Sequence, residues 1–355
     1  MKKHFIKKIK LEGPITIADY MSDCLLAPNH GYYNKNNVIG AKGDFITSPE
    51  ISQIFGELIG LSFVDYWYKC KKPEQPILVD MGGGNGTMMK DALRAIKQVD
   101  KILTKNIQPI FIENSQVLTK KQKLNIPESE SFNDINQIPN GFSMIFANEF
   151  FDALPIHQFI KINNNWHERL IDINPNNDLK FVYSKNPSPY ESILPEYLKN
   201  NNKIIEFSPA IINIITSIVK KILDHGGAFL IIDYALNKND DYGSFQAVKN
   251  HKYINPLIAP GECDLSTKVD FTLIMNIAKE LNANVYGPIK QNIFLRNLGI
   301  DIRCKQLIKN NPDKKQIILN DYYRLTSDHE MGNLFEVILI TSENSIQPAG
   351  FHDIQ

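Results

Sequence analysis

A glycine-rich turn between an expected strand and an expected helix is the first stretch of the sequence that could bind a ligand. The strand covers residues 77–80, the helix covers about residues 87–97, and the letters VDMGGGNGT run from one to the other. Glycine lets the backbone turn sharply and lets a ligand approach closely, and the start of a helix offers unpaired N–H groups. The pattern is defined by Asp80, Gly82, Gly84 and Gly86.

Two kinds of ligand could bind at such a turn. A dinucleotide-binding turn has the spacing G-x-G-x-x-G, which after Gly82 and Gly84 requires a glycine where this chain has Thr87. The acidic residue before the first glycine would also repel a pyrophosphate. It suits instead a ligand with a cationic group, such as the sulfonium and amino group of S-adenosylmethionine. The turn therefore favours S-adenosylmethionine as cofactor, and an ordinary tight loop is the structural alternative.

Two more acidic residues follow later strands of the same expected sheet. Glu113 ends the next strand, where a carboxylate can accept both ribose hydroxyls of an adenosine. Asp134 comes after an expected third strand and could face the adenine amino group. The structural alternatives are a carboxylate near a helix N-terminus for Glu113 and an ordinary turn aspartate for Asp134.

A third set of polar residues follows the apolar strand 141–147 and lies next to two phenylalanines in the sequence. It consists of Asn148, Glu149 and Asp152. We expect this strand beside the glycine-turn strand, so its end should lie near a bound methyl donor. Methyl transfer is an in-line displacement, in which the protein mainly positions the nucleophile and excludes water. Glu149 and Asp152 could hold the planar fork of a guanidinium, and their charge favours the proton loss that follows transfer. The alternative is that Asn148 and Glu149 cap the next helix while Asp152 lies at the surface.

The other polar residues give weaker signals. Glu206 and Asp233 each end an apolar run, and Glu206 could be structural because a helix start follows it. The histidines do not have the spacing of metal ligands and the four cysteines form no CxxC pair, so the sequence predicts neither a metal site nor disulfides.

The elements that must position these residues are indicated by an alternation of strands and helices from about residue 77 to residue 341. Such alternation is typical of an α/β fold, a parallel or mostly parallel sheet with helices on both faces. Residues 14–70 are predicted to be mostly helical. Residues 156–207 are predicted to form antiparallel strands, and residues 236–269 an irregular loop. Because ligands bind at the carboxyl ends of strands in open α/β sheets, the polar residues should converge there.

Composition excludes several classes of protein. The chain has 355 residues, of which 43% are hydrophobic and 22% charged, and its formal net charge is zero. A neutral chain gives no sign of nucleic-acid binding by charge. No apolar stretch approaches the roughly 20 residues of a membrane span, and the N-terminus lacks the apolar core of a secretory signal. The basic residues 1–10 are expected to be a solvated face or tail. We expect a bacterial cytoplasmic protein whose oligomeric state the sequence does not determine.

Several longer stretches resemble the MidA-type protein arginine methyltransferases, a family linked to the assembly of respiratory complex I. They span nearly the whole chain, and GDFITSPEIS and NEFFDALP are the most specific of them. The resemblance implies a seven-stranded Rossmann-like methyltransferase sheet with an N-terminal helical extension and inserted antiparallel strands. It also implies S-adenosylmethionine as cofactor and a protein arginine as acceptor, with a complex I core subunit as one expected target.

The resemblance further divides the chain and assigns roles to residues that match the family's motifs. Residues 1–75 would be an extension over the active site, 76–341 the methyltransferase domain, and 342–355 a tail. This chain differs from the family's usual residues at two positions among others: Ala235 stands where the family has glycine, and Lys268 where it has histidine. These differences concern contacts with the acceptor more than contacts with the cofactor. An assembly module that keeps the fold, or a small-molecule methyltransferase, are the alternative functions. The assigned residues are Gly82, Gly84, Gly86 and Glu113 for the cofactor, Thr47 and Ser48 in the segment over it, and Asn148, Glu149 and Asp152 near the methyl group.

Overall fold

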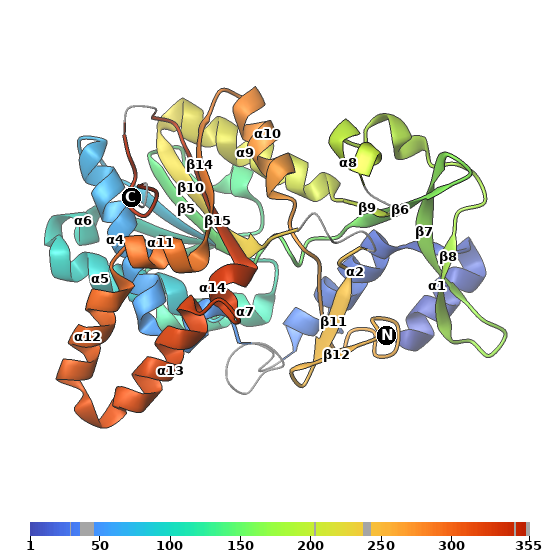
Figure 1. The fold of residues 1–355 in the computed structure, drawn as a ribbon, viewed down its shortest axis with the longest axis horizontal. Coiled ribbons are helices and arrows are strands. Elements are labelled where there is room, and N and C mark those ends of the chain that lie inside the picture. Colours follow the sequence, from blue (N-terminus) through green and yellow to red (C-terminus); the bar gives the residue numbers. More distant parts are fainter. Residues whose placement is uncertain (29, 36–45, 202–203, 237–242, 344–345, 353–355) are drawn as a thin grey trace.

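The computed structural model describes the chain except residues 29, 36–45, 202–203, 237–242, 344–345 and 353–355. Its centre is a seven-stranded sheet in the order β14-β15-β10-β5-β2-β3-β4 (Figure 1). Five neighbours from β10 to β4 run parallel, and β15 pairs antiparallel with both β10 and β14. The predicted α/β fold is confirmed, as is the place of β5 beside the glycine-turn strand β2. The strands are β2 (Ile77–Met81), β3 (Gln108–Ile112), β4 (Glu130–Phe132), β5 (Ser143–Asn148), β10 (Gly227–Tyr234), β14 (Asn284–Lys290) and β15 (Phe335–Thr341).

Helices cover both faces of this sheet because alternate residues of the buried strands point to opposite sides. In β5, Met144 and Phe146 face the cluster that contains α4 and α5, whereas Ile145 and Ala147 face α9 and α10. A Cβ at Gly60 would lie 2.7 Å from the Cα of Ala92, so glycine there lets α4 pack closely on α5. The helices around the sheet are α4 (Gln53–Lys69), α5 (Thr87–Val99), α6 (Lys101–Asn106), α7 (Gln116–Asn125), η2 (Ile135–Gln137), α9 (Pro209–His225), α10 (Phe271–Glu280) and α11 (Gln291–Asn297).

A second body of the molecule lies to the right of the main sheet in Figure 1. It contains the sheet β1-β7-β6-β9 with β8 paired to β7, and the sheet β12-β11-β13. The antiparallel strands predicted within residues 156–207 are confirmed as β6 to β9. The irregular loop predicted for 236–269 is wrong in part, because short strands pair there antiparallel. The strands are β1 (Ile15–Thr16), β6 (His157–Ile162), β7 (Asn165–Ile173), β8 (Leu179–Tyr183), β9 (Ile204–Phe207), β11 (Gln246–Lys249), β12 (Lys252–Ile254) and β13 (Asp264–Ser266).

The N-terminal residues belong to this second body. Of the two expectations for the basic residues 1–10, a solvated face or a tail, the structure shows the face: they lie in a helix, α1, whose Phe5 and Ile9 are buried against α2 and the inserted strands. Its lysines lie on the opposite side of the helix, so the basic residues form the solvent-facing side of an amphipathic helix. The helices of this body are α1 (Lys2–Glu12), α2 (Ile17–Leu26), η1 (Tyr32–Asn34), η3 (Pro189–Ser192) and α8 (Glu196–Asn201). The short helix α3 (Ser48–Ile51) packs instead against α4 and α5 of the main body.

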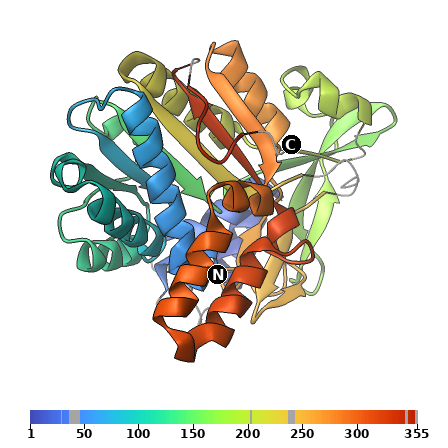
Figure 2. The same cartoon turned by 60° about the vertical axis from the view of Figure 1, so that its left-hand side comes forward.

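Two C-terminal helices, which the sequence pattern did not predict, form an arm below the sheet in Figure 2. They are α12 (Ile300–Asn310) and α13 (Lys315–Thr326), joined by η4 (Pro312–Lys314) and followed by α14 (Met331–Leu334). The proposed domain division at residue 75 stays a prediction. Within residues 1–75, α4 packs in the core of the main sheet, whereas α1 and α2 pack in the second body.

Candidate active site

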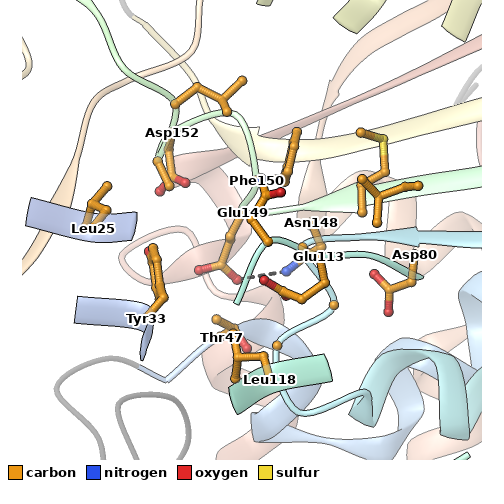
Figure 3. Close-up of a pocket in the computed structure, with 18 of the residues that line it drawn as sticks. Leu25, Tyr33, Thr47, Asp80, Glu113, Leu118, Asn148, Glu149, Phe150 and Asp152 are labelled. Carbon is orange, nitrogen blue, oxygen red and sulfur yellow. Dashed lines mark hydrogen bonds between the residues drawn. The ribbon is translucent and has the colours of Figure 1, made fainter. Parts of the chain in front are cut away.

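A cavity of about 400 Å³ opens at the carboxyl ends of β2, β3 and β5, between the two bodies (Figure 3). This is the edge where an open α/β sheet binds its ligands. All the predicted site residues line it except Gly86 and Ser48. The lining residues that the sequence predicted are Thr47, Asp80, Gly82, Gly84, Glu113, Asp134, Asn148, Glu149 and Asp152.

The glycine turn takes the left-handed backbone conformation that its sequence predicts. The φ angles of Gly82 and Gly84 are 64° and 51°. Gly86, with φ 81°, is the N-cap of α5, and its N–H donates to the carbonyl of Gly83 at 2.7 Å. A Cβ at Gly83 would lie 2.6 Å from Asp80 Oδ2. Gly86 therefore supports the turn through its backbone hydrogen bond to Gly83. The carboxylate of Asp80 occupies the space where a side chain at position 83 would lie.

Asp80 and Glu113 form an acidic pair below the turn. Burial, and then the charge of Glu113, raise the pKa of Asp80 well above its usual value, and Asp80 Oδ2 has no hydrogen-bond partner among the described atoms. Burial raises the pKa of Glu113 to about 7, against hydrogen bonds that stabilise its ionised form. Glu113 Oε1 accepts the N–H of Ser115 at 2.8 Å, and Oε2 accepts Gln122 Nε2 at 3.3 Å.

Gln122 is a site residue that the sequence did not single out. Its Nε2 also donates to the carbonyl of Gly84 at 3.0 Å, so α7 ties the glycine turn to Glu113. Asp134 lies at the exposed rim, where its Oδ1 accepts the backbone N–H of Asn136 at 2.8 Å and caps η2. This cap is the structural role weighed for Asp134, and it leaves the second oxygen of the carboxylate available to a ligand.

Glu149 stands at the opposite end of the cavity in a strained conformation. Its φ of 53° is uncommon for a residue with a side chain, and its N–H is held by the carbonyl of Ile232 at 2.9 Å. Oε1 accepts Asn148 Nδ2 at 3.0 Å and the N–H of Ser48 at 3.1 Å. The structure describes no hydrogen-bond partner for Glu149 Oε2 or Asn148 Oδ1, both of which are buried. The strand end thus presents two unsatisfied acceptors to the cavity.

Several buried carboxyl groups lie around Glu149, and each raises the pKa of its neighbours. Burial raises the pKa of Glu149 to about 8, with a smaller contribution from the charges of Asp233 and Asp264. Burial and the charges of Asp233, Glu149 and Asp264 raise the pKa of Asp152 well above its usual value. Asp233 is the positioning residue here, since its Oδ2 accepts the backbone N–H groups of Phe151 at 2.9 Å and Asp152 at 3.3 Å. The surface position considered for Asp152 is wrong, because its side chain is buried.

The segment that begins at Thr47 joins the two ends of the cavity. Ser48 does not line the cavity with its side chain: its Oγ donates to Met331 Sδ at 3.8 Å, and its backbone N–H holds Glu149. Glu50 Oε1, from the same helical turn, accepts Thr87 Oγ1 at 2.6 Å, at the start of α5. Asp44 of the same motif lies outside the described residues.

Two further lining residues, Tyr33 and Asp264, were not predicted as site residues. Tyr33 belongs to η1 and Asp264 begins β13, and the Tyr33 hydroxyl donates to Asp264 Oδ1 at 2.9 Å. Asp264 lies in the stretch DLSTKVDF, where no glycine turn precedes a helix to distinguish it from other acidic residues. Glu206, in contrast, is structural, since its carboxylate accepts Gln158 Nε2 and the backbone N–H groups of Ser244 and Phe245.

Comparison with known proteins identifies the family. Residues 58–289 match the model of a family of S-adenosyl-L-methionine-dependent methyltransferases. The human protein named protein arginine methyltransferase NDUFAF7, mitochondrial, is 35% identical over 98% of this chain and 84% of its own length. The mouse protein of that name is 37% identical, with coverages of 94% and 83%. The homologue from Caenorhabditis elegans is 33% identical, with coverages of 92% and 83%. The chain belongs to this methyltransferase family.

Solved structures agree with the fold of a methyltransferase. A crystal structure from Burkholderia thailandensis with bound S-adenosyl-homocysteine has a TM-score of 0.83 at 20% identity, and the match covers 98% of this chain and 92% of that one. A native crystal structure from the same organism has a TM-score of 0.80 with the same coverage. At this identity the likeness concerns the fold alone.

The residues of this methyltransferase fit its cofactor. S-adenosylmethionine carries a cationic sulfonium and amino group and an adenosine with two ribose hydroxyls. Asp80 Oδ2 is a buried acceptor with no described partner, the turn has left-handed glycines, and Glu113 ends β3. Within the part of the chain that is described, no three His, Cys, Asp or Glu side chains are grouped to hold a metal ion, and no helix is long and apolar enough to cross a membrane.

Proposed function

We propose that this methyltransferase modifies an arginine side chain of a protein. The observation that carries the proposal is the charge of the cavity. None of the described lining residues is Lys, Arg or His, so an anionic acceptor would find no cationic side chain there. A guanidinium would find several carboxylates. The acidic lining residues are Glu50, Asp80, Glu113, Asp134, Glu149, Asp152 and Asp264.

The acidic residues are divided between two ends of the cavity, and each end has its own role in the proposal. Asp80, Gly82, Gly84 and Glu113 hold S-adenosylmethionine, which when bound supplies a methyl group on its sulfonium sulfur. Asp134 contacts the adenine from the rim. Thr47 covers the cofactor, Ser48 acts through its backbone on Glu149, and Gly86 acts through the shape of the turn. These roles agree with the positions of the residues around one continuous cavity.

At the acceptor end, Glu149 and Asp152 hold the guanidinium by charge-assisted hydrogen bonds, and Asn148 fixes Glu149 through its amide. The nitrogen that receives the methyl group must lose a proton. Glu149, with a pKa of about 8, is a suitable acceptor for it. Phe150 lies against the glycine turn, since a Cβ at Gly82 would come within 2.7 Å of its ring. This aromatic wall helps to exclude water from the reacting atoms.

The family resemblance and the names of the relatives guide the choice of acceptor. The relatives from human, mouse and C. elegans are named protein arginine methyltransferases of mitochondria. We propose a protein arginine as acceptor also in this chain, with a respiratory complex I subunit as the target to examine first. A bacterial cytoplasmic location belongs to the same proposal.

The test is methyl transfer to an unbiased set of proteins. The purified protein is incubated with methyl-labelled S-adenosylmethionine and a lysate of a strain that lacks the gene, and labelled proteins are analysed by mass spectrometry. We expect label on arginine, lost in Glu149→Gln and retained in Asp178→Asn, an exposed carboxylate that pairs with Lys2. Label on lysine or on a small molecule would contradict the proposal. Cofactor binding without any transfer would favour the alternative of an assembly module.

A further inference from the structure

The acceptor end of the cavity has a wall that does not come from the methyltransferase sheet. Tyr33 belongs to η1 in the N-terminal part of the chain, and Asp264 begins β13 in the small inserted sheet. They are 231 residues apart, yet the Tyr33 hydroxyl donates to Asp264 Oδ1 at 2.9 Å. Both side chains line the same cavity as Glu149 and Asp152. Figure 3 shows Tyr33 on the same side of the cavity as Asp152 and Glu149.

Both residues of this wall are held by contacts with their surroundings. The carbonyl of Tyr33 accepts Ser115 Oγ at 2.7 Å, which ties η1 to the end of β3. Thr267, the residue directly after β13, donates its backbone N–H to the carbonyl of Asp152 at 2.9 Å. The segment with Asp264 is therefore fixed to the loop that carries Asp152. Tyr33 and Asp264 have defined positions relative to the strand end of β5.

The carboxylates are close enough to affect one another. The charge of Asp264 contributes to the raised pKa values of Glu149 and Asp152, after the larger effect of burial. For Tyr33 too, burial is the main cause of a raised pKa and the charge of Asp264 comes next. Asp264 thus belongs to the electrostatic environment of the acceptor end.

A second, independent observation indicates that this end is built for a ligand with several donors. Asn148 is 9% exposed, and its Oδ1 has no partner among the described residues, as is also true of Glu149 Oε2. Buried acceptors of this kind are costly unless a ligand satisfies them. A guanidinium has five N–H donors in a planar fork, whereas an ammonium has only three donors around one point.

We propose that Asp264, positioned by Tyr33, is a third carboxylate that contacts the acceptor and makes the site select a guanidinium over a primary ammonium. The proposal rests on arginine methylation as the proposed function and adds the residue that determines specificity. Glu149 and Asp152 come from the loop after β5, and Asp264 faces them from the inserted sheet. A planar fork can reach carboxylates on separate walls at once, while the compact ammonium can contact fewer of them.

The experiment measures binding of two probes to the full-length protein saturated with S-adenosyl-homocysteine. The probes are Nα-acetylarginine methylamide and Nα-acetyllysine methylamide, titrated by calorimetry into unaltered protein, Asp264→Asn, Tyr33→Phe and the surface control Asp178→Asn. We expect Asp264→Asn to weaken arginine-probe binding about tenfold or more, the loss of one charge-assisted hydrogen bond, and to reduce the ratio of arginine to lysine affinity. The affinity of Asp264→Asn for S-adenosyl-homocysteine should change by at most about threefold, because Asp264 does not contact the cofactor in this proposal.

Tyr33→Phe should shift the arginine-to-lysine ratio in the same direction by a smaller factor, because it removes only the hydroxyl that orients Asp264. If the thermal transition of Asp264→Asn shows that this variant does not fold, Tyr33→Phe alone tests the role of Asp264. An unchanged ratio in the folded variants would overturn the role of Asp264 and leave arginine methylation intact. Failure of the unaltered protein to bind the arginine probe or to label arginine in the lysate would overturn both proposals.

Discussion

The two ends of the cavity are both acidic, but they are assembled differently. The cofactor end comes mainly from one continuous part of the chain, residues 80–134, through successive strand and helix units of the main sheet, with Thr47 as the exception. The acceptor end combines the loop after β5 with Asp233 of β10, Tyr33 of η1 and Asp264 of β13. Cofactor recognition therefore depends on local geometry, whereas acceptor recognition depends on how the second body packs against the first.

The ends also differ in charge density. At the cofactor end the raised pKa of Asp80 reflects burial and the single neighbouring charge of Glu113. At the acceptor end the pKa of Asp152 is affected by three other carboxylates. Like charges this close destabilise the ligand-free protein, and a cationic ligand relieves the repulsion. The acceptor end should therefore respond more strongly to pH and to the loss of one carboxylate.

The largest expected effect is on the cofactor end. Gly84→Val places a branched side chain at a φ of 51° in the turn that the cofactor must approach, and we expect no measurable binding of S-adenosyl-homocysteine by calorimetry. Gly299→Val is the matched control, since Gly299 also has a positive φ, of 89°, and its Cβ would meet no described atom within 4 Å. Both variants carry a backbone strain of roughly 1–3 kcal/mol. Normal cofactor affinity in Gly84→Val would mean that the turn is not the binding site.

The next largest effect distinguishes the acceptor end from the cofactor end, because it should change turnover and leave cofactor binding intact. In Glu149→Gln we expect kcat/KM for the protein acceptor to fall by about 30-fold or more, because one charge of a buried contact is lost. Affinity for S-adenosyl-homocysteine should be nearly unchanged. Folding should be preserved, since glutamine resembles the protonated glutamate that a pKa of about 8 favours at neutral pH in the ligand-free protein, whereas a bound guanidinium favours the charged form. Equal losses of turnover and of cofactor affinity would assign Glu149 to the wrong end.

The pH dependence of stability tests the difference in charge density. Several carboxyls have a higher pKa in the folded protein than in the unfolded chain, so the folded state binds more protons and the free energy of unfolding decreases as pH rises. The window extends from about pH 4, where the carboxyls of the unfolded chain ionise, to about pH 8, since the folded pKa is about 7 for Glu113, about 7 for Asp233 and about 8 for Glu149. Urea unfolding of the ligand-free protein should show this loss.

Two glutamine variants assign the pH dependence to one end or the other. We expect Glu149→Gln to remove more of it than Glu113→Gln does, because the pKa of Glu149 is raised further. A larger effect of Glu113→Gln would place the greater electrostatic cost at the cofactor end and contradict the comparison.

Asp233 should show a smaller effect that combines stability and activity. Asp233→Ala leaves the buried N–H groups of Phe151 and Asp152 without their acceptor, and we expect a loss of about 1–3 kcal/mol in the free energy of unfolding for an unsatisfied group. Turnover should fall because the loop that carries Asp152 loses its anchor. Asp233→Asn retains one acceptor oxygen and should lose less of both. Full activity in Asp233→Ala would show that this hydrogen-bonded anchor is unnecessary.

The smallest effect concerns the rim of the cofactor end. Asp134→Ala should weaken binding of S-adenosyl-homocysteine by at most about tenfold, the range of a single hydrogen bond. Asp134→Asn keeps an oxygen for the cap of η2 and serves as the control for a purely structural role. If both variants bind the cofactor as the unaltered protein does, Asp134 only caps the helical turn.

Several features of the molecule were determined by the sequence alone. The alternation of strands and helices predicted the α/β sheet, because hydrophobic periodicity is a local property of the chain. Glycine spacing predicted the turn at Gly82 and Gly84, and polar residues after apolar strands predicted Glu113 and Glu149. Each of these signals lies within a few residues of the side chain that it concerns. The predicted cavity residues from the main sheet accordingly came together.

Other features were decided only by the tertiary structure. The pairing of Tyr33 with Asp264 joins residues far apart in sequence, and it depends on the packing of α1 and α2 against the inserted strands. Nothing in the local pattern indicated that β11, β12 and β13 pair as strands or that Ser48 acts through its backbone. Such contacts depend on which buried surfaces meet and in what register, and these long-range choices have no signature in a short stretch of sequence.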